Sequence, residues 1–159
     1  MKQRINNDFL TAYKTGNIQL KTTLGGIKAA ITIWETSKQN AGKTITDDDI
    51  VNILGVESKK RKDAFTLYIQ EGSEKGLEKA TKEVEELDII VSYLPKQLSD
   101  EKVRNIVISF LGENILPNDD AKALRGMMGL VMKEFKTHYN GQYDSVKLKA
   151  IVEDILQLT

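Results

Sequence analysis

The stretch YLPKQLSDEKV, residues 93–103, contains one of the two prolines of the chain and separates two long helical patterns. Pro95 has no backbone N–H and biases the residue before it away from helical dihedrals, so we expect a helix to end at Leu94. Ser99 is a favourable N-cap with two acidic residues directly after it, which predicts that the next helix starts there. The sequence therefore divides into two helical parts at this joint.

Upstream of the joint, apolar residues recur every three or four positions, the spacing of one face of an α-helix. No segment alternates apolar and polar residues as a strand does. We predict an all-α protein in which residues 1–95 form an N-terminal bundle of about four helices. The predicted helices are residues 2–15, a segment carrying Leu20 to Trp34, one that follows the N-cap Thr46, and one carrying Leu77 to Leu94.

Two features of these helices predict how they pack. Gly25 and Gly26 interrupt the second helix at a cost of about 1 kcal/mol each relative to alanine, which suggests close approach by a neighbouring helix. The fourth helix has a near-heptad repeat, which predicts a seam buried by antiparallel helix packing. The seam consists of Leu77, Ala80, Val84, Leu87, Val91 and Leu94.

Downstream of the joint, residues 96–159 are predicted to form a small three-helix C-terminal domain. The stretch PNDDAKAL, residues 117–124, reads as a helix start with Asp119 or Asp120 as its cap. The helix that follows carries Met127, Met128 and Met132. These methionines favour a core position, with an adaptable docking surface as the alternative.

Charge and composition exclude several classes of function. The chain has 23 basic and 23 acidic residues, so no overall field favours nucleic acid or an anionic membrane. Residues 1–44 hold seven basic and two acidic residues (+5), and residues 45–95 hold seven and twelve (−5), so any basic surface must be a patch. With no cysteine, disulfides and thiolate metal sites are excluded. No apolar run reaches the roughly 18 residues of a membrane span and no secretory h-region is visible, which predicts a soluble, cytoplasmic protein.

The sequence offers no catalytic constellation, metal site or cofactor motif. His138, the single histidine, lies in a predicted turn without a nucleophile motif, so we read it as an exposed turn residue. Glu83 and Glu86 lie one helical turn apart, as in di-iron bundles, but the histidines of such a site are missing. We therefore expect these two glutamates to form salt bridges.

The densest basic run is KKRK, comprising Lys59, Lys60, Arg61 and Lys62. Cations that contact phosphates release condensed counterions, so these residues are candidate nucleic-acid contacts, together with Lys133 and Lys136 on the sixth helix. Four consecutive positions of a helix point to all sides, however. A solvated helix surface is therefore the alternative reading of the KKRK run.

With these motifs in place, the chain resembles the YqeY family, the stand-alone relatives of the C-terminal part of the GatB subunit of glutamine-dependent tRNA amidotransferases. The most specific stretch is EVEELDIIVSYLPKQLSDEKV, residues 83–103. It is supported by KKRKDAF at 59–65, MGLVM at 128–132 and NGQYDS at 140–145. Family members usually carry a lysine and an arginine beside the glycine matched by Gly141, where this chain has asparagine and glutamine.

The resemblance implies a helical N-terminal part, a three-helix C-terminal domain and a non-catalytic accessory module. The corresponding tail of GatB-like proteins contacts tRNA, so the implied partner is tRNA or a protein of the translation apparatus. Two alternatives stay open. One is carbon–nitrogen ligase activity with glutamine as amido-N-donor, inherited by resemblance, which needs a nucleophile and an ATP site for which no motif is visible. The other is a purely protein-binding scaffold.

Overall fold

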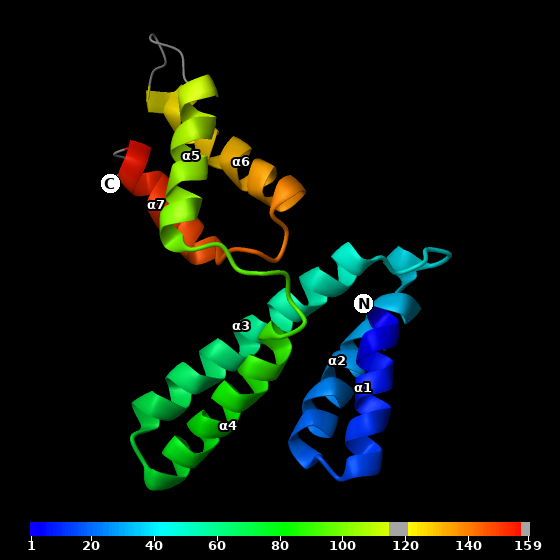
Figure 1. Ribbon diagram of the computed structural model, residues 1–159. Helices are drawn as coiled ribbons and strands as arrows, with labels where there is room; N and C mark the ends of the chain where they lie inside the picture. The colour runs from blue at the N-terminus through cyan, green and yellow to red at the C-terminus, as the bar shows by residue number, and fades with distance from the viewer. Residues whose placement is uncertain (115–120, 157–159) are drawn as a thin grey trace. The chain divides into compact units, whose positions relative to one another are not determined.

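The structure is a computed structural model that describes residues 1–114 and 121–156 (Figure 1). Within these ranges the chain forms seven α-helices, one short 3-10 helix and no strand, which confirms the all-α prediction. The chain divides into two compact units, Met1–Leu94 and Pro95–Thr159. The predicted cap at Asp119 or Asp120 lies outside the described residues.

The first unit contains two helical hairpins (Figure 1). Gly16 and Gly72 end the first helix of each hairpin in the left-handed conformation, with φ of 71° and 67°, which glycine adopts without a steric penalty. Helices α1 and α2 form one hairpin, and α3 and α4 the other. The elements of this unit are α1 (Lys2–Thr15), α2 (Ile18–Thr36), the 3-10 helix η1 (Lys38–Asn40), α3 (Asp47–Glu71) and α4 (Glu74–Val91).

Helix α3 begins after Thr46, the N-cap that the sequence predicts. Thr46 Oγ1 accepts a hydrogen bond from the backbone N–H of Asp49, and the Asp49 carboxylate accepts one from the backbone N–H of Thr46. This reciprocal capping box satisfies two N–H groups that a helix terminus leaves without partners. Hydrogen bonding from Thr46 also lowers the pKa of the Asp49 carboxyl below its ordinary value.

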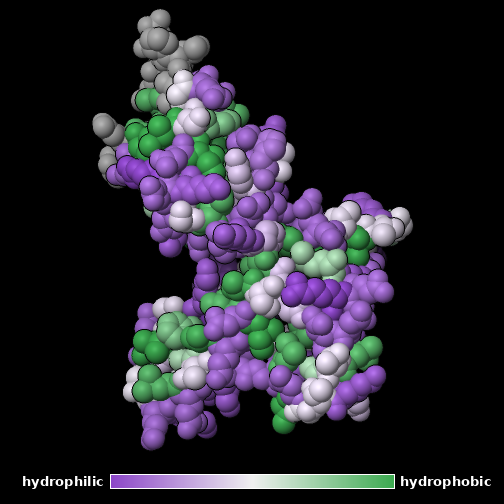
Figure 2. All heavy atoms as spheres, in the orientation of Figure 1, coloured by the Kyte–Doolittle hydropathy of each residue, from purple (hydrophilic) through white to green (hydrophobic). Residues whose placement is uncertain are grey.

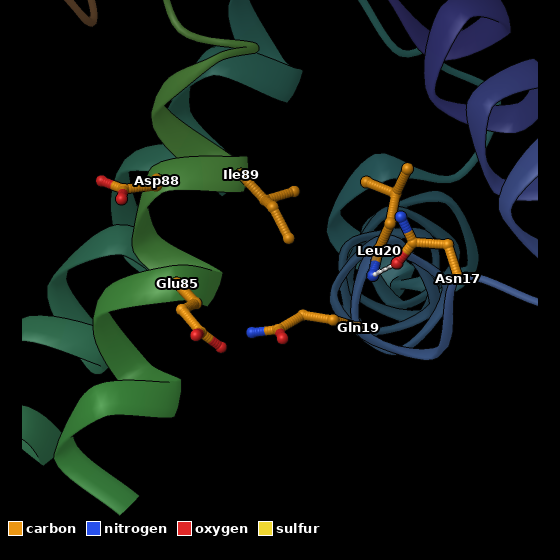
Figure 3. Close-up of a pocket in the computed structure, with 6 residues that line it drawn as sticks. All are labelled: Asn17, Gln19, Leu20, Glu85, Asp88 and Ile89. Carbon is orange, nitrogen blue, oxygen red and sulfur yellow. Dashed lines mark hydrogen bonds between the residues drawn. The ribbon is translucent and has the colours of Figure 1, made fainter. Parts of the chain in front are cut away.

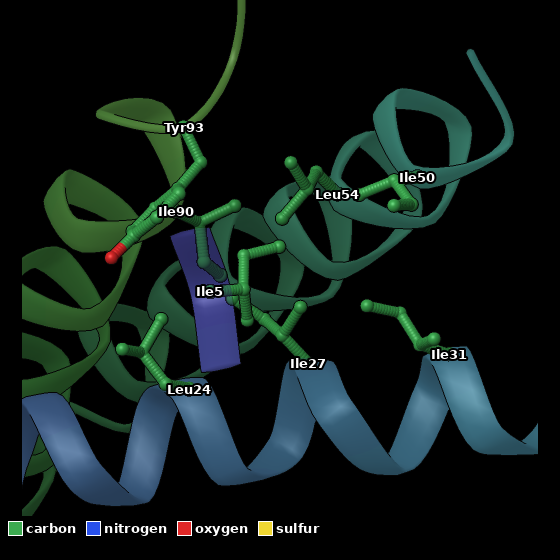
Figure 4. Packing of buried hydrophobic residues seen from close by; sticks show 8 residues of the cluster. All are labelled: Ile5, Leu24, Ile27, Ile31, Ile50, Leu54, Ile90 and Tyr93. Atoms are coloured by element: carbon green, nitrogen blue, oxygen red, sulfur yellow. The ribbon is translucent and has the colours of Figure 1, made fainter. Parts of the chain in front are cut away.

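The core of the first unit lies where the two hairpins meet (Figure 4). It contains one residue from α1, three from α2 and two from the beginning of α3. The other two lie at the end of α4 and just after it. Burial of these large aliphatic side chains is the main stabilising contribution to the unit. The cluster consists of Ile5, Leu24, Ile27, Ile31, Ile50, Leu54, Ile90 and Tyr93.

The seam predicted for α4 is wrong at three positions. Ala80 is buried, but Leu77, Val84 and Val91 are 51%, 39% and 40% exposed. The helix is rotated so that Gly76, Ala80 and Ile90 are its buried residues. The physical reason is that α4 packs against both α3 and α2, and its buried stripe faces between them.

The close approach predicted at the glycine pair of α2 is also absent. A Cβ at Gly26 meets no atom within 4 Å, and one at Gly25 meets the Phe9 ring at 3.5 Å, an ordinary contact. The tight position is Gly76, where a Cβ lies 2.9 Å from the carbonyl oxygen of Tyr68. The α3–α4 hairpin therefore needs its glycine at the first turn of α4.

The second unit has its own core. Its helices are α5 (Asp100–Asn114), α6 (Ala121–His138) and α7 (Ser145–Leu156). Met127, Met128 and Met132 pack against this core, which confirms the core reading of the methionines. The buried cluster is Val103, Val107, Leu111, Val131, Phe135, Leu148 and Val152.

The segment after Pro95 is fastened to the turn between α6 and α7. The backbone N–H of Leu98 donates to the carbonyl oxygen of Gln142 at 2.7 Å, and the Gln97 side-chain amide donates to that of Gly141 at 2.5 Å. Gly141 has a φ of 73°, which favours glycine. The NGQYDS motif thus positions carbonyl groups that hold the beginning of the second unit.

Candidate nucleic-acid interface

Arg61, at the centre of the KKRK run, is held by carboxylates between α3 and α4. Its Nη1 lies 3.3 Å from the Oε2 atoms of both Glu83 and Glu86, and its Nη2 lies 3.9 Å from Glu57 Oε2. Glu57 is buried, and the other two glutamates are largely so. The salt bridges predicted for Glu83 and Glu86 are therefore confirmed, and Arg61 has the geometry of an interhelical clamp.

The three lysines of the run differ from Arg61 in exposure. Lys60 Nζ lies 2.6 Å from Glu57 Oε1, although its side chain is 62% exposed. Lys59 and Lys62 are also exposed. Because a carboxylate neutralises the charge that a phosphate would otherwise meet, this run offers a weaker anion site than its composition indicates.

The outer face of α6 has a more uniform charge. Arg125, Lys133 and Lys136 are exposed and, within the described residues, form no ion pair. At 100° per residue their Cα–Cβ directions fall within a sector of about 80°, so they share one face. Lys133 and Lys136 are predicted site residues that the structure brings together, whereas Arg125 was missed. Arg125 stands eight residues before Lys133, a spacing that places both side chains on one face of a helix. This spacing is the signal in the sequence that identifies Arg125.

Two exposed glycines lie between these cations. Gly126 and Gly129 leave open space where a side chain would stand, since a Cβ at either position meets no atom within 4 Å. The helix backbone is therefore accessible along this face. We call the set of Arg125, Gly126, Gly129, Lys133 and Lys136 the α6 basic face.

His138 lies elsewhere on α6. It is the last residue of the helix rather than a turn residue, and its Nδ1 lies 2.9 Å from Glu134 Oε1. Glu134, one turn earlier, thus faces the histidine and not the three cations of the α6 basic face. The histidine is exposed, as predicted.

The two predicted sets of cations belong to different units. Lys59 to Lys62 lie in Met1–Leu94, and Lys133 and Lys136 lie in Pro95–Thr159. Each set is therefore described within its own unit.

The first unit also contains an open groove between the start of α2 and the second half of α4 (Figure 3). Its volume is about 470 Å³, and Leu20 and Ile89 form its apolar part. Gln19 and Glu85 point toward each other across it. Asn17 is occupied, because its side chain accepts a hydrogen bond from the backbone N–H of Leu20 at 3.0 Å. The lining offers amides and carboxylates and no nucleophile.

The described part of the chain contains no group of three or more histidine or acidic side chains placed to hold a metal ion. None of its helices combines the length and the apolar character that crossing a bilayer requires.

The fold and these surfaces define a two-unit helical protein with a basic helix face. The model of the family described as Yqey-like protein matches residues 2–156, nearly the whole chain. The chain therefore belongs to the YqeY-like family. A search of the curated proteins finds no match to it.

Proposed function

We propose that this protein is a non-catalytic accessory module that binds tRNA through the α6 basic face. Three exposed cations on one helix face, for which the described part of the chain supplies no carboxylate partner, carry the proposal. Phosphate groups repeat along a nucleic-acid backbone, and a row of unpaired cations gains affinity by releasing the counterions condensed on them. The relationship of YqeY-like proteins to the tail of the amidotransferase subunit GatB favours tRNA as the nucleic acid.

The chemistry of the surface is that of phosphate binding without base readout. Arginine can donate two parallel hydrogen bonds to one phosphate, and lysine supplies a mobile point charge. Gly126 and Gly129 let a sugar–phosphate chain approach the helix closely, because no side chain stands in the way. We expect affinity to depend steeply on salt and weakly on sequence.

Filter binding of total tRNA across a salt series tests the proposal. The triple variant Arg125→Ala, Lys133→Ala, Lys136→Ala removes three contacts, which should lower the slope of log K against log salt by about 2 to 3. A matched control replaces Lys14, Lys96 and Lys102 by alanine, since these are exposed lysines for which no ion pair is found within the described residues. An equal loss in both variants, or no tRNA retention by the wild type at low salt, rejects the proposal.

A pair of substitutions at one position sharpens the test. Gly129 has room for a side chain and lies among the three cations. Gly129→Arg should strengthen tRNA binding and Gly129→Glu should weaken it, each by roughly threefold to tenfold, the effect of about 1 kcal/mol of charge interaction near the surface. If the two substitutions change the affinity for tRNA in opposite directions, the effect is one of charge. If both change it equally, the effect is steric, which contradicts the proposal.

A further inference from the structure

The α3–α4 hairpin has an apolar face that no part of the first unit covers. Phe65 and Ile69 on α3 are 37% and 44% exposed, and Leu77, Val84 and Val91 on α4 are 39% to 51% exposed. Hydrophobic residues gather at the far end of this hairpin in the view of Figure 2. A set of large, half-exposed apolar side chains that are neighbours marks an interaction surface.

The five residues share one side of the hairpin. Arg61 and Glu83 point toward each other across the helix pair, which fixes the inward direction of each helix. Phe65 and Ile69 lie about 40° and 80° from the direction of Arg61 at 3.6 residues per turn. The three α4 residues lie about 80° to 120° from Glu83 in the same sense of rotation. Because α3 and α4 run antiparallel, rotation in the same sense from the inward direction of each helix leads to the same side of the hairpin. The apolar stripes of the two helices therefore adjoin.

The edges of this face carry opposite charges. The exposed Lys62, about 100° from Arg61, borders the α3 stripe, with the exposed Lys59 beyond it, and beyond the α4 stripe lie the exposed Glu74 and Asp88. Among the described residues, Lys59, Glu74 and Asp88 form no ion pair. The Arg61 contacts with Glu83 and Glu86 also fix the register of the hairpin, and they place Lys59 at nearly the same level as Asp88.

A second copy of the same hairpin complements this arrangement. A two-fold axis parallel to the helices lays the apolar faces together and sets α3 of one copy over α4 of the other. Lys59 of each copy then faces Asp88 of the other, so the charge pair forms twice. A two-fold axis across the helices would set the Lys59 edges against each other, and is disfavoured by repulsion.

We propose that the protein forms a homodimer through this face, with the two α3–α4 hairpins packed as a four-helix bundle. The apolar stripe forms the centre of the interface, and the pairs between Lys59 and Asp88 select the orientation of the copies. This surface belongs to the first unit and shares no residue with the α6 basic face, so dimer formation and tRNA binding can be tested separately.

Sedimentation equilibrium of the full chain between about 1 and 100 μM tests the proposal. The wild type should dimerise, and Val84→Lys should raise the dissociation constant at least tenfold, because it places a charge at the centre of the apolar contact and opposite the like charge of Lys62. The control is Leu67→Lys, on the opposite side of α3 and 65% exposed, which should change it less than twofold. Circular dichroism of both variants verifies that the helices are retained.

A charge exchange tests the orientation. Lys59→Glu alone and Asp88→Lys alone should each weaken the dimer about threefold to tenfold, and the double variant should recover the wild-type constant. A monomer throughout the concentration range overturns the proposal, as does a dimer that Val84→Lys and Leu67→Lys weaken equally. A dimer whose charge exchange fails to recover overturns the proposed axis.

Discussion

Tyr93 joins the end of α4 to α1. It is buried, its hydroxyl donates to Asp8 Oδ2 at 2.6 Å, and the Arg4 guanidinium lies 4.6 Å from the centre of its ring. Burial, followed by the hydrogen bond to Asp8, raises the pKa of Tyr93 above its ordinary value of 10.0. The tyrosine of the family stretch at residues 83–103 therefore has a structural role in the first unit.

We predict that Tyr93→Phe lowers the free energy of unfolding at pH 7 by about 1 to 2 kcal/mol, because Asp8 loses its hydroxyl partner. The raised pKa adds a dependence on alkaline pH. Below pH 10 the hydroxyl is protonated in both states and its contribution is complete, whereas above pH 10 the unfolded state releases the proton first and stability falls. Urea denaturation at pH 7 and pH 10.5 measures both effects.

The phenylalanine variant should lose less stability than the wild type between these two pH values. Tyr143, whose pKa burial also raises, is present in both proteins, so a shared residual dependence is expected. Identical losses in the two proteins would contradict the role assigned to Tyr93.

Two glycines of the first unit should respond in opposite ways to alanine. Gly26→Ala adds a methyl group to open space in a helix interior and should stabilise the protein by about 1 kcal/mol. Gly76→Ala sets its methyl group 2.9 Å from the backbone oxygen of Tyr68, so it should destabilise despite the better helix propensity. Thermal unfolding of the two variants in parallel measures the contrast, and a stabilising Gly76→Ala would show that the hairpin relaxes.

At the scale of the elements, α3 and α4 are joined by charge as well as by apolar packing. Arg61 contacts three carboxylates from two helices, and its own side chain is only 30% exposed. A largely buried arginine among several glutamates helps set helix register, because a shift by one turn leaves carboxylates without a partner.

We expect Arg61→Met to destabilise the protein by roughly 2 kcal/mol, less than a fully buried pair because solvent reaches the cluster. Methionine keeps most of the apolar stem, so the loss reports mainly on the stranded carboxylates. Lys60→Met is the matched control and should cost less than about 1 kcal/mol, since Lys60 is exposed. Urea denaturation distinguishes them, and equal losses would refute the clamp role of Arg61.

At the scale of the whole molecule, each unit has a core made entirely of its own residues. The segment that follows Pro95 bonds to Gly141 and Gln142, which belong to the same unit. We therefore predict that the two compact units, Met1–Leu94 and Pro95–Thr159, fold independently of each other.

A fragment of residues 95–159 should therefore unfold cooperatively, although with low stability, because a domain of about 65 residues buries only about 60% of its chain surface. Circular dichroism melting and dispersed amide signals in an NMR spectrum would show this. A fragment that melts without cooperativity would mean that the second unit requires the first.

Local sequence information predicted the helices but not which neighbouring helices pack on each of their faces. The capping residues Thr46 and Ser99 and the breaks at Gly16 and Pro95 act through neighbours in the chain, so the sequence alone locates them. The predicted seam of α4 failed at Val84 because the face that a helix buries depends on which helices pack on it. The apolar period alone does not contain that information.

The same distinction between local and tertiary information applies to the candidate nucleic-acid interface. The sequence by itself determined an all-α chain with a break at Pro95, since hydrophobic period, caps and proline act over a few residues. The tertiary structure decided that Arg61 faces carboxylates across the hairpin while Arg125, Lys133 and Lys136 face solvent. The availability of a cation depends on the distance to the nearest carboxylate, and residues 61 and 83 become neighbours only when the chain folds.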